Sequence, residues 1–182
     1  MTESYATLSQ ESLAESPRIY VLLLRQDDPR KCSAAKLAKF RLATPLFRMR
    51  QIPRRTIVLN PFAPQVLLPA DRAMAERNGI VSIDCSWEKV DKAFAIRMPG
   101  EPRRLPPLLA SNPVNYAKVH KLSSAEAIAG ALCIMGLSDR ATRILSLFKW
   151  GPAFFTLNSQ LLRSYSQAAT EADVARISAD FF

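Results

Sequence analysis

Four short apolar runs, separated by helix-like segments, constrain the fold of this chain more than any other feature. Each run is continuous and rich in leucine or β-branched residues: 18–25, 55–61, 79–84 and 107–112. Such runs are typical of parallel strands that are covered on both faces. Helix-like patterns lie between them, at 31–42, 69–78 and 86–94. The alternation predicts an α/β fold with a parallel sheet and a ligand site at the carboxyl ends of its strands.

The second half of the chain has a different pattern. Four helical segments follow one another without an intervening strand, at 123–136, 138–148, 152–168 and 171–182. Ser123 or Ser124 is expected to cap the first of them and Gly136 to end it. We therefore predict a flexible tail over 1–17, an α/β domain over 18–104 and an all-α domain over 105–182.

Charge and composition indicate the kind of partner. The first 17 residues carry three acids and no base, and residues 171–182 carry three acids and one base. Residues 18–170 therefore hold a net charge of +14, although the whole chain has only +9. This favours a polyanionic partner such as nucleic acid, although a basic solvated surface explains it too. The longest apolar run, 19–24, is too short to cross a bilayer, so we expect a cytoplasmic protein without a membrane partner.

Several common kinds of site are excluded by the residue types. His120 is the only histidine and has no GxSxG motif near it, which argues against a Ser/His/Asp triad. Glycine is scarce, and neither a P-loop nor a GxGxxG motif is present. The three cysteines are far apart, so we expect reduced thiols and no metal site.

Unusual residues follow the expected strands. Ser33 lies after the first run and is either a plain helix cap or a hydroxyl that binds a carboxylate. In 84-DCSWEKV-90, Asp84 and Trp87 are either a catalytic acid/base and a ligand-stacking ring or a helix cap and a core residue. The polar stretch 111–127 links the two halves. Loops converging on one sheet edge predict a small-molecule pocket at the seam between the domains.

Three motifs identify a family. The chain contains DCSW, then LxASNPVNYxxxxKLSSAEA, then FKWGxxFxxLN, in this order. Together they resemble the small-subunit (16S/18S) rRNA aminocarboxypropyltransferases, over about residues 18–170. The acidic tail typical of eukaryotic members is missing, so the chain is similar to archaeal members. The resemblance implies a SPOUT-like fold with a deep trefoil knot and S-adenosylmethionine (SAM) as co-substrate. It also implies transfer of the 3-amino-3-carboxypropyl (acp) group to N3 of a methylated pseudouridine, release of methylthioadenosine and a role in ribosome biogenesis.

The resemblance also implies roles for single residues. Asp84 would be the catalytic residue that takes the N3 proton, and Ser33 would bind the SAM carboxylate. Ile83 would hold the ribose through its carbonyl group, and Leu105 or Leu108 would meet the adenine edge. Trp87 and Val90 would bury the methyl group of SAM. The remaining apolar walls would come from both halves of the chain: Leu59, Pro61, Leu122 and Ala127.

Charge and position predict the contacts with RNA. The cations nearest the expected site and on the second C-terminal helix are Arg30, Lys31, Arg140, Arg143 and Lys149. The expected partner is small-subunit rRNA or a pre-ribosomal particle, and a monomer is expected. Two other functions remain open at this point: a SPOUT-like RNA methyltransferase and a non-catalytic rRNA-binding assembly factor.

Overall fold

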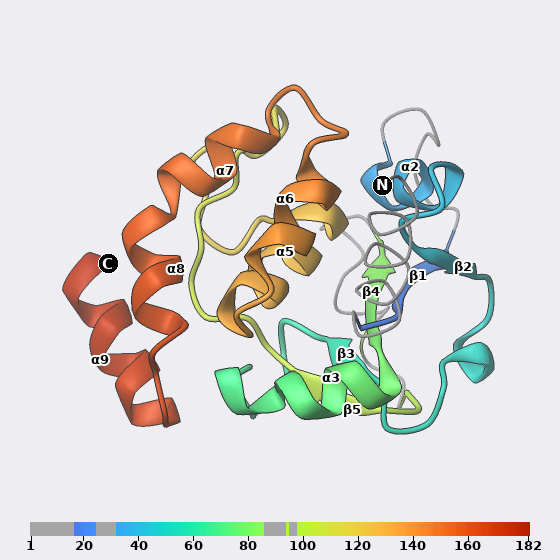
Figure 1. Ribbon diagram of the computed structural model, residues 1–182, viewed down its shortest axis with the longest axis horizontal. Coiled ribbons are helices and arrows are strands. Elements are labelled where there is room, and N and C mark those ends of the chain that lie inside the picture. Colours follow the sequence, from blue (N-terminus) through green and yellow to red (C-terminus); the bar gives the residue numbers. More distant parts are fainter. Residues whose placement is uncertain (1–16, 25–31, 86–93, 95–97) are drawn as a thin grey trace, which may run out of the picture.

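The computed structural model describes residues 17–24, 32–85, 94 and 98–182 (Figure 1). Within this part of the chain, five parallel strands form one sheet in the order β2-β1-β4-β3-β5. Their bounds are β1 (Ile19–Leu23), β2 (Thr44–Leu46), β3 (Ile57–Leu59), β4 (Ile80–Asp84) and β5 (Glu101–Arg103). The predicted combination of a parallel α/β half and a helical C-terminal half is confirmed.

The two faces of the sheet are buried by different segments. On one face, Ile19, Val21 and Ile57 pack in a cluster with α2 (Ser33–Lys39), α3 (Arg72–Asn78) and α5 (Ser124–Ile134). On the other face, side chains such as Leu22 and Val81 pack with Ile52, which follows the 3-10 helix η1 (Met49–Gln51). Because side chains alternate along a strand, burial of both faces explains the continuous apolar runs of β1 and β4.

The prediction of a strand over 107–112 is wrong. Leu109 makes only an isolated antiparallel bridge, with Val119, and the fourth predicted strand is replaced by two strands that the sequence did not suggest. These are β2 and β5, the two edges of the sheet, and each contains a proline, Pro45 or Pro102. A proline has no N–H to donate, so it is tolerated at an edge, where one side of the strand needs no partner.

The helical half is built from α5, α6 (Ser138–Leu145), α7 (Gly151–Leu157), α8 (Ser159–Tyr165) and α9 (Glu171–Phe181). Ser123 caps α5, and Gly136 follows its end with a φ of +74°, as predicted. The single helix expected over 152–168 is wrong, because the chain turns at Asn158 and forms α7 and α8. A short 3-10 helix η2 (Pro69–Asp71) precedes α3.

Both halves of the chain share one hydrophobic cluster. Val21 of β1, Leu132 of α5, Phe154 of α7 and Val174 of α9 all belong to it. In Figure 1, α5 and α6 lie between the sheet and the outer helices α7, α8 and α9. The expected tail over 1–17 lies outside the described residues except Pro17, and the expected helix over 86–94 lies outside them except Phe94. Among the described helices, none combines the length and the apolar character needed to cross a membrane.

Candidate functional site

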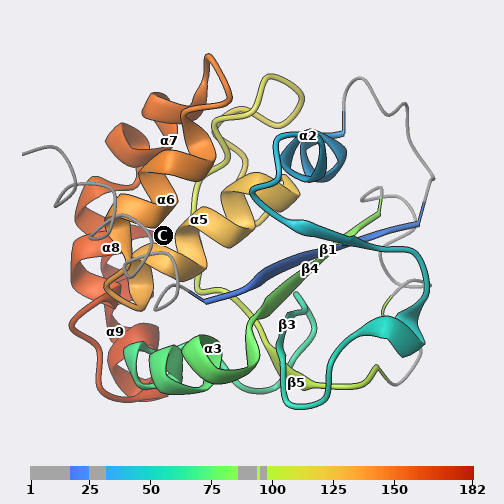
Figure 2. The same cartoon turned by 45° about the vertical axis from the view of Figure 1, so that its right-hand side comes forward.

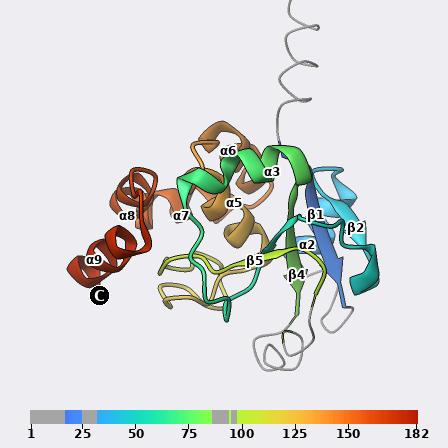
Figure 3. The same ribbon diagram turned by 90° about the horizontal axis from the view of Figure 1, so that it is seen from below.

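Three parallel strands end at the edge of the sheet where the sequence predicts the site. Leu23 of β1 pairs with Asp84 of β4, and Leu59 of β3 pairs with Ser82 of β4. The last residues of β1, β3 and β4 are therefore neighbours. In Figure 3 the head of the β4 arrow marks the carboxyl end of that strand. This is the edge at which parallel α/β sheets bind their ligands.

Asp84 is bound by a cysteine that the sequence did not single out. The thiol of Cys32 donates a hydrogen bond to Oδ2 of Asp84 over 3.0 Å. The same sulfur caps α2, because it accepts a hydrogen bond of 3.1 Å from the backbone N–H of Ala35. Burial, and then the hydrogen bond to Asp84, raise the pKa of Cys32 to about 12. The thiol therefore keeps its proton near neutral pH and remains a donor to the carboxylate.

Ser33 lies one residue farther on and connects the two halves. The cap of α2 is Cys32, so the interpretation of Ser33 as a plain helix cap is wrong. Its Oγ instead accepts a hydrogen bond of 3.2 Å from the backbone N–H of Ala125, in the first turn of α5. A hydroxyl oxygen that accepts one bond still carries its own O–H donor. Figure 2 shows the resulting arrangement, with α2 and the start of α5 next to each other above β1 and β4.

The apolar residues assigned to the cofactor differ in their burial. Leu59 and Ile83 are buried within their strands, whereas Pro61 is exposed just beyond β3. Leu122 and Ala127 flank the start of α5 and are half-buried. Of these segments, β4, which carries Ile83, packs against α5, which carries Ala127.

Leu105 and Leu108 were alternatives for the adenine edge. Leu105 is half-buried. Leu108 is fully buried, and its carbonyl oxygen already accepts a hydrogen bond of 3.1 Å from the N–H of His120. The predicted contact is made by the backbone, so both assignments remain predictions.

Glu126 is the most deeply buried acid at the seam, with no exposed surface. Its Oε1 accepts hydrogen bonds from Ser111 N (2.6 Å), Ser111 Oγ (3.0 Å) and Asn112 N (2.9 Å). Its Oε2 accepts hydrogen bonds of 2.7 Å from both Asn112 Nδ2 and Ser123 N. The bond to Ser123 completes a capping box, so one side chain both starts α5 and holds the linker. The S-x-x-E spacing of Ser123 and Glu126 was the sequence signal for this role.

Asn158, at the turn between α7 and α8, is a second buried side chain that binds the backbone, just before the linker. Its side-chain amide accepts a hydrogen bond of 2.8 Å from Leu109 N and donates one of 2.9 Å to Leu109 O. It also donates one of 2.9 Å to Phe154 O. The backbone of Leu109 thus binds a side chain where a strand would have bound a neighbouring strand. An asparagine in a helical pattern, where it is a poor helix former, was the signal for this break.

The predicted RNA-binding cations of the helical half are differently exposed. Arg143 and Lys149 are exposed, and Arg140 is half-buried. Burial, and then the nearby Arg143, lower the pKa of Arg140 from its usual value, and within the described residues its buried Nε has no hydrogen-bond partner. Lys36 of α2, which the sequence did not single out, donates a hydrogen bond of 2.6 Å to Leu147 O. This bond brings the segment before Lys149 next to α2.

Four predicted residues lie outside the described part of the chain: Trp87, Val90, Arg30 and Lys31. Their assignments remain predictions.

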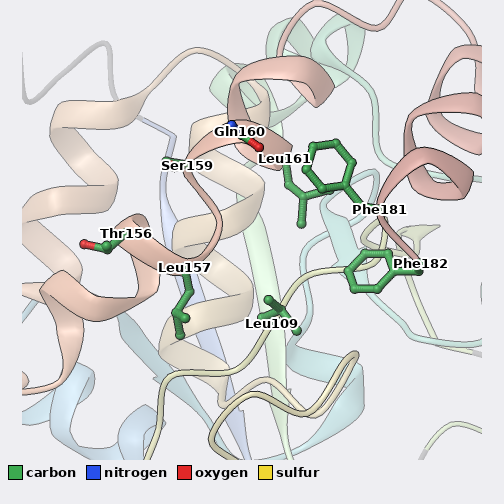
Figure 4. Close-up of a pocket in the computed structure, with 8 residues that line it drawn as sticks. All are labelled: Leu109, Thr156, Leu157, Ser159, Gln160, Leu161, Phe181 and Phe182. Carbon is green, nitrogen blue, oxygen red and sulfur yellow. The ribbon is translucent and has the colours of Figure 1, made fainter.

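A separate hollow of about 330 Å³ opens between α8 and the C-terminal end of the chain. Figure 4 shows the rings of Phe181 and Phe182 beside Leu161 and Leu109. All the side chains that line it are uncharged, and none belongs to the residues assigned to SAM. A zwitterionic ligand with a sulfonium charge has no ionic partner among these side chains, so this hollow is not the candidate cofactor site.

Comparisons with known proteins agree with the motifs. A family model described as "Ribosome biogenesis protein, C-terminal" matches residues 57–182. The 16S rRNA aminocarboxypropyltransferase of Methanothermobacter thermautotrophicus is 44% identical over 168 residues, which cover 90% of this chain and 98% of the relative. The chain belongs to this aminocarboxypropyltransferase family. The sequence-based identification is thereby confirmed.

Two further relatives extend the comparison. The 16S rRNA aminocarboxypropyltransferase of Methanosarcina mazei is 39% identical, over 90% of this chain and 94% of the relative. The solved structure of the SAM-dependent rRNA:acp-transferase Tsr3 from Vulcanisaeta distributa is 36% identical and superposes with a TM-score of 0.79. That superposition covers 90% of this chain and 97% of the solved one, so the fold is shared across both halves.

Proposed function

We propose that this protein transfers the acp group of SAM to N3 of a methylated pseudouridine in small-subunit rRNA. Family membership supports the reaction class. The structural observation that carries the proposal is that the start of α2, the end of β4 and the start of α5 are joined by hydrogen bonds. The hydrogen bond between Cys32 and Asp84 joins the start of α2 to the end of β4. The hydrogen bond between Ser33 and Ala125 joins the same start of α2 to the start of α5.

The polar and apolar groups at this junction fit SAM. The Oγ of Ser33 accepts a hydrogen bond from Ala125 N, and we assign its remaining O–H donor to the carboxylate of SAM. Leu122 and Ala127 of the helical half are half-buried and provide apolar surface, and we assign the buried Leu59 at the end of β3 to the opposite wall. When bound, SAM supplies a carbon activated by its sulfonium, and its sulfur leaves as the neutral thioether methylthioadenosine.

Asp84 is the group that we assign to proton transfer. Its carboxylate accepts the N3 proton of the pseudouridine, so that the nitrogen lone pair is available to form the new N–C bond. The thiol of Cys32 donates a hydrogen bond to Oδ2 and so orients this carboxylate. Trp87 and Val90 are assigned to the methyl group of SAM, whose burial there leaves the acp carbon facing the RNA.

Cations on the helical half are assigned to the rRNA. Arg143 and Lys149 are exposed, and the bond between Lys36 and Leu147 places their segment beside α2. Arg140 is assigned to the same surface, and Arg30 and Lys31 to the turn before α2. We further propose a SPOUT-like topology with a deep trefoil knot, a SAM site between 18–104 and 105–182, and action as a monomer in ribosome biogenesis. The motif resemblance supports these finer assignments.

The deciding experiment uses SAM labelled separately in the methyl carbon and in the carboxyl carbon. The protein is incubated with small-subunit rRNA and each SAM, and the modified nucleoside is identified by mass spectrometry. We expect label from the carboxyl carbon only. Label from the methyl carbon would make the protein a SPOUT-like methyltransferase. Absence of SAM binding in calorimetry would leave a non-catalytic assembly factor.

Two variants separate cofactor binding from catalysis. Asp84→Asn keeps the size of the side chain, and we expect it to bind SAM but to lower transfer by about 10²- to 10⁴-fold, the usual range for a general base. Trp87→Ala is expected to weaken SAM binding in calorimetry. Wild-type turnover of Asp84→Asn would remove the base from the mechanism, and wild-type SAM affinity of Trp87→Ala would remove Trp87 from the pocket.

A further inference from the structure

The segment from Leu109 to Val119 forms a narrow loop, here called the 109–119 finger. An antiparallel bridge joins Leu109 to Val119 at its base. Above it, Ala110 N donates a hydrogen bond of 3.0 Å to Lys118 O, and Ala117 N donates one of 2.7 Å to Ala110 O. Ala117 has a φ of +59°, which turns the chain back. The finger is therefore held together by its own backbone.

The finger is also anchored from outside by two buried side chains. Glu126 binds Ser111 and Asn112 through four hydrogen bonds, and Asn158 binds both backbone polar groups of Leu109. At the tip, Asn115 N donates hydrogen bonds to both the backbone and the side-chain oxygen of Asn112. Anchors at the base and a hydrogen-bonded turn at the tip give the finger a fixed conformation.

The tip of this finger presents apolar surface to solvent. Val114 is 79% exposed and Tyr116 is 59% exposed. The stretch 109–122 contains Lys118 and Lys121 and no acidic residue. Glu126, which follows it, is buried. An exposed aromatic ring next to cations is the combination with which proteins bind unpaired nucleobases by stacking.

We propose that Tyr116 stacks on an unpaired base of the rRNA substrate and so positions the neighbouring nucleotide for reaction. This inference rests on the proposed function for the identity of the RNA. The finger is anchored to Glu126, and the adjacent Ala125 is the residue whose N–H binds Ser33. A base held on the finger is therefore fixed relative to the start of α5 and the candidate SAM site. A flat ring and positive charge favour RNA over a protein partner as the occupant.

The test measures RNA binding without any transfer step. The probes are synthetic hairpins that together cover the loops of small-subunit rRNA, with the fluorescent adenine analogue aminopurine at single unpaired positions. Wild-type protein is expected to bind one hairpin and to quench one such position. Tyr116→Ala is expected to lose the quenching and at least about fivefold in affinity, the lower end of what one stacked base contributes. Tyr116→Phe keeps the ring and is expected to retain both.

Matched variants distinguish stacking from charge and from general loop damage. Val114→Ala removes apolar surface from the same tip without removing a ring, and is expected to bind like wild type. Lys118→Ala is expected to reduce the dependence of log K on log salt by about one unit, whereas Tyr116→Ala leaves that slope unchanged. SAM affinity by calorimetry is expected to stay at the wild-type value in Tyr116→Ala.

Three results would overturn the inference: wild-type RNA affinity of Tyr116→Ala, equal losses in Tyr116→Phe and Tyr116→Ala, or no hairpin bound by wild-type protein. Failure of the proposed reaction has a different signature. In that case Tyr116-dependent quenching persists while labelled SAM leaves no acp group on the RNA.

Discussion

Replacement of Glu126 by glutamine tests whether a single buried carboxylate organises the seam. The substitution keeps the shape of the side chain and exchanges one carboxylate oxygen for an NH₂ group. Oε1 of glutamine can still accept from Ser111 and Asn112 N. The NH₂ group then faces Asn112 Nδ2 and Ser123 N, which are both donors and lie 2.7 Å from Oε2 of Glu126 in the native protein.

The expected loss follows from these two contacts. A hydrogen bond to a charged group contributes about 1.5–3 kcal/mol, so losing two costs roughly 3–6 kcal/mol. A flip of the Asn112 amide would restore one of them, but it would sacrifice the hydrogen bond of 3.1 Å that Asn115 N donates to Asn112 Oδ1. With the flip, the variant still loses one hydrogen bond to the charged group and the bond from Asn115, so the free energy of unfolding falls by at least about 2 kcal/mol. Since domains are stable by only about 5–15 kcal/mol, a loss of this size is easily measured.

Urea unfolding followed by circular dichroism measures the free energy of unfolding. Glu76→Gln is the matched control, because it removes an exposed carboxylate that pairs with Arg72 at 2.8 Å, and such pairs contribute about 1 kcal/mol or less. A Glu126→Gln variant within about 1 kcal/mol of wild type would refute the reasoning, because the carboxylate would then not be the organising group.

Three further predictions concern other parts of the structure. Asn158→Leu leaves the N–H and the carbonyl group of Leu109 without their side-chain partner, and we expect a loss of about 2–6 kcal/mol in urea unfolding. Burial, and then the charge of Arg104, lower the pKa of His120, so NMR should find that its imidazole titrates with a midpoint below 6.5. The unfolded chain then binds a proton more readily than the folded one, so the stability contributed by neutral His120 should be lost as pH falls below 6.5. Arg104→Gln should raise that midpoint only in part. Hydrogen bonding to Thr170 lowers the pKa of Asp173, so its stabilisation of α9 should be lost as pH falls below 3.8, and Asp173→Asn should abolish this acid dependence in thermal unfolding.

The central strands could be predicted from the sequence and the edge strands could not. β1, β3 and β4 lie inside the sheet, where burial of both faces leaves a continuous apolar run. At the edges, β2 and β5 are only three residues long and contain Pro45 and Pro102. The run at 107–112 is as apolar as a central strand because it is buried against helices. An apolar run predicts that a segment is buried, but it does not predict whether strands or helices bury it.

For the polar groups of the candidate site too, local sequence patterns predict some residues and miss others. Asp84 and Ser33 were found because they follow apolar runs, and the structure brings both next to Cys32. Cys32 itself gave no signal, since a lone cysteine in sequence is most often a buried thiol. Its role depends on a contact with a residue 52 positions away. Such a pairing is fixed by the strand order of the sheet, which local patterns do not contain.

The three motifs that identify the family are bound to one another in the structure. Asn158, which ends the third motif, holds Leu109 in the second. Glu126, near the end of the second motif, holds Ser111 near its start. Asp84, which opens the first motif, is held by Cys32 beside Ser33, and Ser33 in turn binds the second motif at Ala125. Much of what makes the sequence recognisable therefore specifies the scaffold of the seam. A substitution in these motifs that abolishes activity is consequently evidence for a catalytic role only when the free energy of unfolding is unchanged.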